Sequence, residues 1–328
     1  MEVILSKNYV ISIDMGGTKI LAGVINSQEG IIARIKKPTF PGGGETEYVN
    51  SLSEIAEVLV RKSKLKSKNI KAVCLGIPGS LNPYSGIVGL APNLGLRNFN
   101  AKQRLKNRIP FPVIIENDVN LGALGVKNFG AAKKAKNILV VFIGTGIGGA
   151  IFIDGKLYRG SSYSAGEIGH IKIADDGPLC GCGKTGCFEA FASRASIVKA
   201  IEADIAAHKK SIIVKLAETG KPIKSRMLAS AVKLNDKLTI EHISSACEKI
   251  GLTLANITDV MNFDMIVLGG GLVEALDYFM LPRIKASFDK VVLKDVSKAV
   301  KIVVNDLGDD AALYGGIALA EEFLGITV

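Results

Sequence analysis

The middle of the chain brings together one histidine and three cysteines: His170, Cys180, Cys182 and Cys187. A glycine follows each of the first two cysteines and precedes the third, which provides the tight turns that converging ligands require. Thiolates and imidazole suit tetrahedral zinc, and four such ligands leave no coordination position open. These residues therefore predict a structural Zn²⁺ site. The other two of the five cysteines, Cys74 and Cys247, lie in apolar segments and are interpreted as core residues.

Three glycine-rich loops each follow an apolar run, and backbone amides in such loops can point at phosphate oxygens. None has the Walker spacing or the dinucleotide fingerprint in its strand–turn–helix setting. We expect Asp14 to orient Mg²⁺ through its waters, and Lys19 either to approach the phosphates or to remain a surface residue. The second loop would clamp phosphate, and the third, which opens a helix, would support the adenosine. The predicted nucleotide-binding residues are Asp14, Gly16, Gly17, Thr18 and Lys19, then Gly144, Thr145 and Gly146, and finally Gly269, Gly270 and Gly271.

Asp118 follows a short buried strand and precedes a helical pattern over Val119–Val126. One interpretation makes Asn117 or Asp118 a helix N-cap. The other makes Asp118 the general base that accepts the proton of an attacking hydroxyl, with the Asn117 amide holding neighbouring hydroxyls. Glu167 and Glu189 lie beside the predicted zinc ligands, in a stretch rich in glycine and apolar residues. Carboxylates and amides can each satisfy several hydroxyls, so these residues are candidates for binding a sugar.

The order of apolar segments predicts an α/β protein with a largely parallel sheet and antiparallel hairpins. Two hairpins are expected, one joining Val10–Ile13 to Ile20–Ile25 and the other joining Ile138–Ile143 to Ala150–Ile153. This repeated layout predicts two structurally similar halves. We place the domain boundary near Asp118, so that residues 1–117 and 309–328 form a smaller domain and residues 118–308 a larger one. Phosphoryl transfer would take place in a cleft closed by two phosphate clamps.

The chain has a formal net charge of +10, but its lysines are scattered and aromatic residues make up only 6%. This pattern favours a solvated lysine surface, whose field would also attract an anionic nucleotide, and it disfavours a nucleic-acid site. The longest apolar stretch, Ile138–Ile153, is interrupted by glycines and is too short to span a bilayer. We find no signal peptide at the N-terminus and no disulfide pattern, so we expect a cytoplasmic protein without a membrane partner.

Taken together, these motifs resemble the ROK family of sugar kinases and repressors along nearly the whole chain. The similar segments are Ile13–Lys19, Ala91–Asn93, Glu116–Asp118, Gly144–Gly149, Ala165–His170 and Cys180–Glu189. The resemblance implies a two-domain actin-like ATPase (ribonuclease H-like) fold with an inter-domain cleft, Mg²⁺-ATP as cosubstrate and a homodimer. It makes Asp118 the catalytic base and His170 a ligand of both zinc and sugar. The residues that it implies around the sugar are Gly79, Ser80, Asn93, Asn117, Asp118, Glu167, His170 and Glu189.

The resemblance implies transfer of the ATP γ-phosphate to a hexose, with O6 of glucose as the preferred acceptor. Kinases of N-acetylmannosamine, N-acetylglucosamine or fructose are the alternatives, and a sugar-sensing regulator without turnover is an alternative of another class. The Ala91–Leu94 segment departs from the family, because no tryptophan follows it and the chain contains none. Family repressors carry an N-terminal helix-turn-helix domain. Because the first strand is expected by Val10, we expect no such domain here and disfavour DNA binding.

Overall fold

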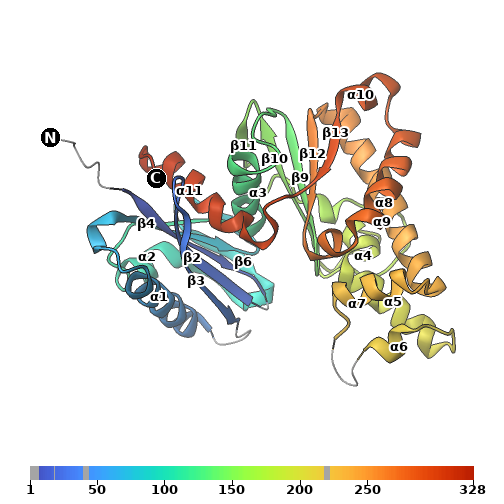
Figure 1. Cartoon of the computed structure of the whole chain (residues 1–328), viewed down its shortest axis with the longest axis horizontal. Coiled ribbons are helices and arrows are strands. Elements are labelled where there is room, and N and C mark those ends of the chain that lie inside the picture. Colours follow the sequence, from blue (N-terminus) through green and yellow to red (C-terminus); the bar gives the residue numbers. More distant parts are fainter. Residues whose placement is uncertain (1–6, 18, 40–43, 218–221) are drawn as a thin grey trace. The chain divides into compact units, whose positions relative to one another are not determined.

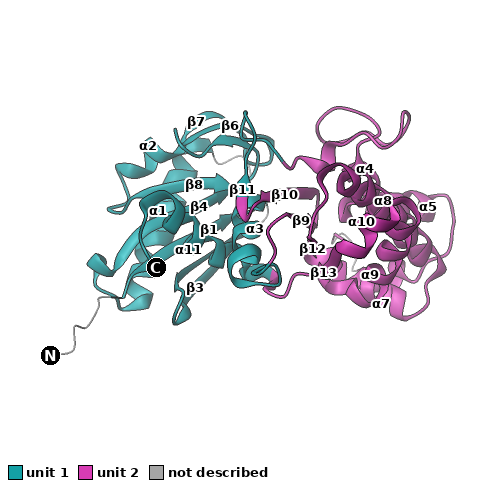
Figure 2. Ribbon diagram, turned by 90° about the horizontal axis from the view of Figure 1, so that it is seen from above, with its two compact units in different colours: residues 1–134, 157–165, 309–328 teal, residues 135–156, 166–308 magenta. Residues whose placement is uncertain are grey.

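The computed structural model describes residues 7–17, 19–39, 44–217 and 222–328, and divides into two compact units (Figure 2). The first unit comprises Met1–Lys134, Leu157–Ala165 and Asp309–Val328. The second comprises Ala135–Lys156 and Gly166–Gly308. The domain boundary expected from the sequence, after residue 117, falls between a strand and a helix that both belong to the first unit.

A five-stranded sheet in the order β3-β2-β1-β4-β8 forms the centre of the first unit (Figure 1). Its antiparallel part is formed by β1 (Tyr9–Met15), β2 (Lys19–Asn26) and β3 (Gly30–Pro38), which confirms the first predicted hairpin. The parallel part adds β4 (Ile70–Ile77) and β8 (Val113–Asn117). Parallel neighbours end at the same edge, so β1, β4 and β8 carry their carboxyl ends to one edge of this sheet.

Helices cover both faces of this sheet. Ile11 and Ile13 of β1 share an apolar cluster with α1 (Gly44–Ser63). Ser12, which points to the opposite face, donates a hydrogen bond to the Ala312 carbonyl of α11 (Ala311–Leu324). Helix α3 (Asp118–Phe129) packs on α11. A small separate sheet is formed by β5 (Ser80–Asn82), β6 (Ile87–Ala91) and β7 (Leu96–Asn100). The unit also contains α2 (Ala101–Lys106) and the 3-10 turns η1 (Ser67–Asn69), η2 (Pro92–Leu94) and η4 (Gly308–Asp310).

The second sheet repeats the arrangement of the first, in the order β11-β10-β9-β12-β13. Its strands are β9 (Ile138–Ile143), β10 (Ile147–Ile153), β11 (Lys156–Tyr158), β12 (Met265–Gly269) and β13 (Lys301–Val304). The β9–β10 pair is antiparallel, whereas β12 runs parallel to both β9 and β13. Each sheet thus has a hairpin followed by two parallel strands, which confirms the two similar halves inferred from the glycine-interrupted hairpins.

The helices of the second unit pack around an apolar core that includes Leu139, Ile250 and Ile284. They are α4 (Phe188–Ala192), α5 (Arg194–Ala206), α6 (Ile213–Leu216), α7 (Ser225–Lys233), α8 (Lys237–Met261), α9 (Gly271–Val291) and α10 (Lys294–Ala299), with the 3-10 turn η3 (Ile168–His170). Within the described part of the chain, none of the helices has the length and the apolar content that crossing a membrane requires.

Candidate active site and metal centre

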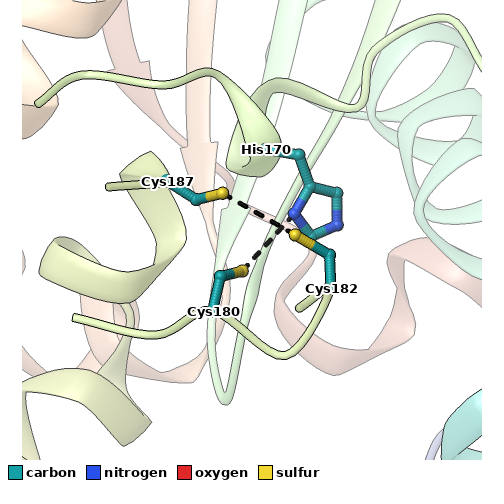
Figure 3. A group of neighbouring side chains, drawn as sticks. All are labelled: His170, Cys180, Cys182 and Cys187. Atoms are coloured by element: carbon teal, nitrogen blue, oxygen red, sulfur yellow. Dashed lines mark hydrogen bonds between the residues drawn. The ribbon is translucent and has the colours of Figure 1, made fainter. Parts of the chain in front are cut away.

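The four residues predicted to bind zinc converge in the second unit (Figure 3). His170 ends the turn η3, Cys180 and Cys182 lie in the following loop, and Cys187 is the N-cap residue of α4. The loop folds back on itself, since the Cys180 amide donates to the Lys184 carbonyl at 2.8 Å. Gly186 has a φ of 79°, and a Cβ there would lie 2.0 Å from the Ala174 carbonyl oxygen. Glycine is therefore required at this turn.

The spacing of the four ligand atoms fits a tetrahedral metal ion. Cys180 Sγ lies 3.6 Å from His170 Nδ1, and Cys182 Sγ lies 3.7 Å from Cys187 Sγ. A zinc tetrahedron with ordinary bond lengths has edges of about 3.6 Å between sulfur and nitrogen and about 3.8 Å between two sulfurs. All four ligand atoms lie within 4.8 Å of one another. The donor set and its geometry thus fit a structural Zn²⁺.

Two carboxylates lie next to this metal centre. His170 turns its Nδ1 towards the cysteines, and its Nε2 lies 3.9 Å from Glu167 Oε2. Glu189 Oε2 accepts a hydrogen bond of 2.7 Å from the Ile147 amide at the start of β10, and its Oε1 lies 3.8 Å from Cys180 Sγ. Glu189 therefore connects the cysteine loop to the second glycine loop, a role that the sequence did not predict.

The candidate base lies at the carboxyl edge of the first unit's sheet. Asn117 is the N-cap residue of α3, and its Oδ1 accepts hydrogen bonds from the amides of Val119 and Asn120 at 2.9 and 3.1 Å. The N-cap interpretation therefore holds for Asn117, and Asp118 is the first residue of the helix. The Asn117 side chain also donates to the Gly79 carbonyl at 3.3 Å. These contacts fix the backbone that carries Asp118.

Asp14 and Asp118 are neighbours at this edge. Asp14 pairs with Gly76 in the β1–β4 register, and a Cβ on Gly76 would lie 3.2 Å from the Asp118 Cα. Burial, and next the charge of Asp118, raise the pKa of Asp14 to about 7. An unpaired carboxylate is costly in such a place, so the edge favours a group that supplies positive charge. A hydrated Mg²⁺ beside Asp14 fits this requirement.

Lys19 is held by a carboxylate from the other end of the chain. Its Nζ donates hydrogen bonds of 2.8 and 2.7 Å to the two carboxylate oxygens of Asp309. Burial acts to raise the pKa of Asp309, but the hydrogen bonds and charge of Lys19, with a contribution from Lys36, lower it below its usual value. Lys19 is thus an ion-paired residue beside the first glycine loop. Gly16 and Gly17 lie in that loop, whereas Thr18 lies outside the described residues.

The residues predicted to line the sugar site in the first unit lie near the same loop. A Cβ on Gly17 would lie 3.5 Å from the Asn93 Cβ. Gly79 has a φ of 104°, and a Cβ there would lie 2.2 Å from the Leu90 carbonyl oxygen, so the β4–β5 connection requires glycine. Ser80 follows as the exposed first residue of β5.

The second and third glycine loops end the neighbouring parallel strands β9 and β12. Gly144 and Gly146 close a tight turn through an amide-to-carbonyl bond of 2.9 Å, and the Thr145 hydroxyl accepts from the Arg194 guanidinium at 2.8 Å. Gly270 is the N-cap of α9, with a φ of 90°. The structure therefore collects the candidate residues into two groups, one at the carboxyl edge of each sheet.

The structure adds one buried ionic group that the sequence analysis missed. Arg159 contacts Glu116, the residue before Asn117, and Glu322 near the end of α11. No local pattern joins positions so far apart in the sequence. The only available signal was that Glu116 is a charged residue at the end of an apolar strand.

Two sheets with the same strand order, each carrying a glycine loop between its first two strands, define an actin-like ATPase fold. The chain matches the ROK family model over residues 10–323 and belongs to that family. It is 30% identical over 313 residues to a glucokinase of Halalkalibacterium halodurans, with 95% of this chain and 94% of the relative covered. It is also 28% identical to a xylose repressor of Bacillus spizizenii, with 97% of this chain and 78% of the repressor covered.

A solved structure of similar fold is the ROK family glucokinase from Streptomyces griseus in complex with glucose and AMPPNP. It has a TM-score of 0.82 and 28% identity, with 96% of this chain and all of that chain covered. The relatives thus include both glucokinases and a xylose repressor.

Proposed function

We propose that this protein is an ATP-dependent sugar kinase, with O6 of glucose as its preferred acceptor. The observation that carries this proposal is the position of Asp118. It is the first residue of α3, on a backbone fixed by the Asn117 cap, and it lies beside Asp14 of β1, the strand that leads into the first glycine loop. A carboxylate at that position can take a proton from a hydroxyl that approaches a phosphate bound by the loop.

In the proposed reaction, the acceptor hydroxyl oxygen forms a bond to the γ-phosphorus of ATP while the bond from that phosphorus to the ADP oxygen breaks. The hydroxyl proton passes to the Asp118 carboxylate. Asp14 would hold the waters of Mg²⁺, which neutralises the phosphate charge when it is bound. The glycine loops would contact the nucleotide, and the zinc ion would order the loop between His170 and Glu189.

The sugar would be bound by side chains and backbone from both groups of candidate residues. The first unit would contribute Gly79, Ser80, Asn93 and Asn117, and the second would contribute Glu167, His170 and Glu189. Because His170 Nδ1 faces the cysteines, its Nε2 can serve a sugar hydroxyl. We further propose that the protein works as a cytoplasmic homodimer.

The test is Mg²⁺-dependent ADP release from ATP with glucose, mannose, fructose, N-acetylglucosamine and N-acetylmannosamine, with Asp118→Ala in parallel. A sugar-stimulated rate that collapses in the variant supports the kinase and identifies the acceptor. Stimulation by fructose or an N-acetylhexosamine alone would mean that this sugar, rather than glucose, is the acceptor. No stimulation by any sugar, in folded and zinc-loaded protein, would refute the proposal.

A second candidate function is a sugar-responsive regulator without turnover, which the similarity to xylose repressors favours. Thermal unfolding measured with each of these sugars and with xylose separates the two. A sugar that raises the unfolding temperature without releasing ADP supports the regulator, whereas the kinase requires both effects from the same sugar.

A further inference from the structure

Glu116 lies buried directly before the Asn117–Asp118 pair. Only 1% of the residue is exposed, and its Oε1 accepts hydrogen bonds from the Asn117 amide at 2.9 Å and the Asn120 side chain at 3.1 Å. One carboxylate oxygen thus holds both the backbone before Asp118 and a side chain one helical turn further on. Because these donors come from the strand end and the first turn of α3, the contact fixes the point where β8 becomes α3.

The other oxygen of Glu116 is paired with Arg159. The Arg159 Nε donates to Glu116 Oε2 at 2.7 Å, while Nη1 and Nη2 donate to the two oxygens of Glu322 at 2.7 and 3.0 Å. The side chains of Arg159 and Glu116 are 8% and 2% exposed, so neither charge has much access to water. A buried carboxylate that loses its partner is costly to keep in place. Arg159 therefore holds the Glu116 carboxylate in place.

The segment that carries Arg159 is anchored to the first unit by a second contact. Tyr163 lies 5.6 Å from Tyr84, measured between ring centroids, and Tyr84 lies 5.4 Å from Phe323 of α11. Four residues beyond Tyr163 the chain reaches Glu167, and three residues later His170. The anchored segment thus leads directly into the part of the second unit that holds candidate sugar ligands.

We propose that Arg159 is a positioning residue for phosphoryl transfer. It holds the Glu116 carboxylate, which fixes the Asn117 backbone and so sets the direction of the Asp118 side chain. This inference rests on the proposed kinase function. A purely structural ion pair would leave the turnover of folded protein unchanged when Arg159 is replaced, whereas a positioning role requires that turnover to fall.

The first experiment measures hydrogen–deuterium exchange in the absence of substrates, in the parent, Arg159→Ala and Arg104→Ala. Arg104 is the control, since its contact with Glu45 is exposed and 3.9 Å long. In Arg159→Ala we expect exchange to increase over residues 113–121, with no change over residues 138–143 of the second unit. Equal exchange over 113–121 in the parent and Arg159→Ala would overturn the positioning role, whether or not the protein is a kinase.

The second experiment measures kcat and KM on samples matched for folded fraction and zinc content. We expect Arg159→Ala to lower kcat about 10- to 100-fold while changing the KM for ATP less than about threefold, because misplacing a reacting group costs rate rather than nucleotide binding. Arg104→Ala should retain the parent kcat. Millimolar guanidinium should partly restore Arg159→Ala, and Glu116→Gln should lower kcat without adding to the effect of Arg159→Ala, since both act through one contact.

The two possible failures are distinguishable. A parent without sugar-dependent ADP release refutes the proposed function. An active parent whose kcat is retained in folded Arg159→Ala, or a variant that loses stability but not kcat, overturns this inference and leaves the kinase intact.

Discussion

Gly125 of α3 lies against Gly315 of α11, so closely that neither position can hold a side chain without moving a helix. A Cβ on Gly125 would lie 1.9 Å from the Ala311 carbonyl oxygen and 3.0 Å from the Gly315 nitrogen. A Cβ on Gly315 would lie 1.8 Å from the Leu121 carbonyl oxygen. Because α3 begins with Asp118, this contact between helices also sets the position of the candidate base.

We expect Gly315→Ala to destabilise the protein by about 1–3 kcal/mol, the usual cost of forcing extra volume into a packed core. It should also lower turnover of the folded protein, because α3 must shift. Urea unfolding and kcat measure the two effects. Gly271→Ala is the control for stability, since the nearest atom to its added Cβ would be 3.8 Å away. Equal stability of Gly315→Ala and the parent would contradict the close contact.

Asp118→Asn removes the proton acceptor while keeping the size of the side chain. We expect kcat for the best sugar to fall about 10²- to 10⁴-fold, the usual contribution of a general base, with little change in sugar KM. Initial-rate kinetics at saturating ATP measure the loss. The control is Asp295→Asn, whose side chain is 97% exposed and which should retain activity. A retained kcat in Asp118→Asn would show that another group accepts the proton.

Short-range patterns made a large part of this architecture predictable. Two apolar runs joined by a glycine-rich turn identified the β1–β2 hairpin, and the zinc ligands were identified because all four lie within one short stretch. The helical pattern over Val119–Val126 identified α3, although the helix extends to Phe129. Family motifs then made the ROK assignment possible, and the family match confirms it.

Long-range and irregular features were not predictable in this way. Arg159 and Glu322 are 163 positions apart, and nothing in their local sequences indicates that they meet. The short strands β5 and β6 follow Pro78 and Gly79 and have too few residues for a clear alternation. Helix α9 contains Pro282 and a non-helical residue at Leu276, so tertiary packing overrides the local preference.

Loss of a zinc ligand should remove the metal and disorder its loop. We expect Cys182→Ser to reduce zinc from about one ion per chain to near zero, because four ligands complete a structural site. The unfolding temperature should fall, since binding of structural zinc to small peptides contributes about 10–16 kcal/mol. Elemental analysis and thermal unfolding measure both effects. Cys247→Ala is the control, because Cys247 is buried in α8 away from this cluster, and it should keep its zinc.

If Cys182→Ser retains a full equivalent of zinc, the predicted site is wrong. If it loses zinc but keeps the exchange rates of residues 171–187, the ion does not order the loop.

The raised pKa of Asp14 predicts how the stability of the nucleotide-free protein depends on pH. Folding raises this pKa from 3.8 to about 7, through burial first and then the charge of Asp118, with Lys19 opposing and Asp309 adding to the shift. The folded state therefore binds the proton more tightly than the unfolded state. The cost of ionising Asp14 in the folded state lowers the stability progressively as pH rises from about 4 to 7, and the full destabilisation is present above that range. Asp14→Asn should be more stable than the parent at pH 8, and this advantage should vanish near pH 4.

Asp264→Asn provides a control of opposite sign. The hydrogen bond from the Asn137 amide lowers the pKa of Asp264. Burial acts in the opposite direction, but the hydrogen bond from the Lys136 amide also lowers the pKa, which lies below its usual value. Its carboxylate therefore stabilises the fold above its unfolded pKa, and this contribution is lost as pH falls through the folded pKa. Urea unfolding of the parent and both variants between about pH 2 and pH 8 should show the Asp14→Asn difference changing between about pH 4 and pH 7, and the opposite Asp264→Asn difference changing only below about pH 4. Parallel curves for Asp14→Asn and the parent would mean that the Asp14 carboxylate is solvated, and the case for a cation beside it would then fail.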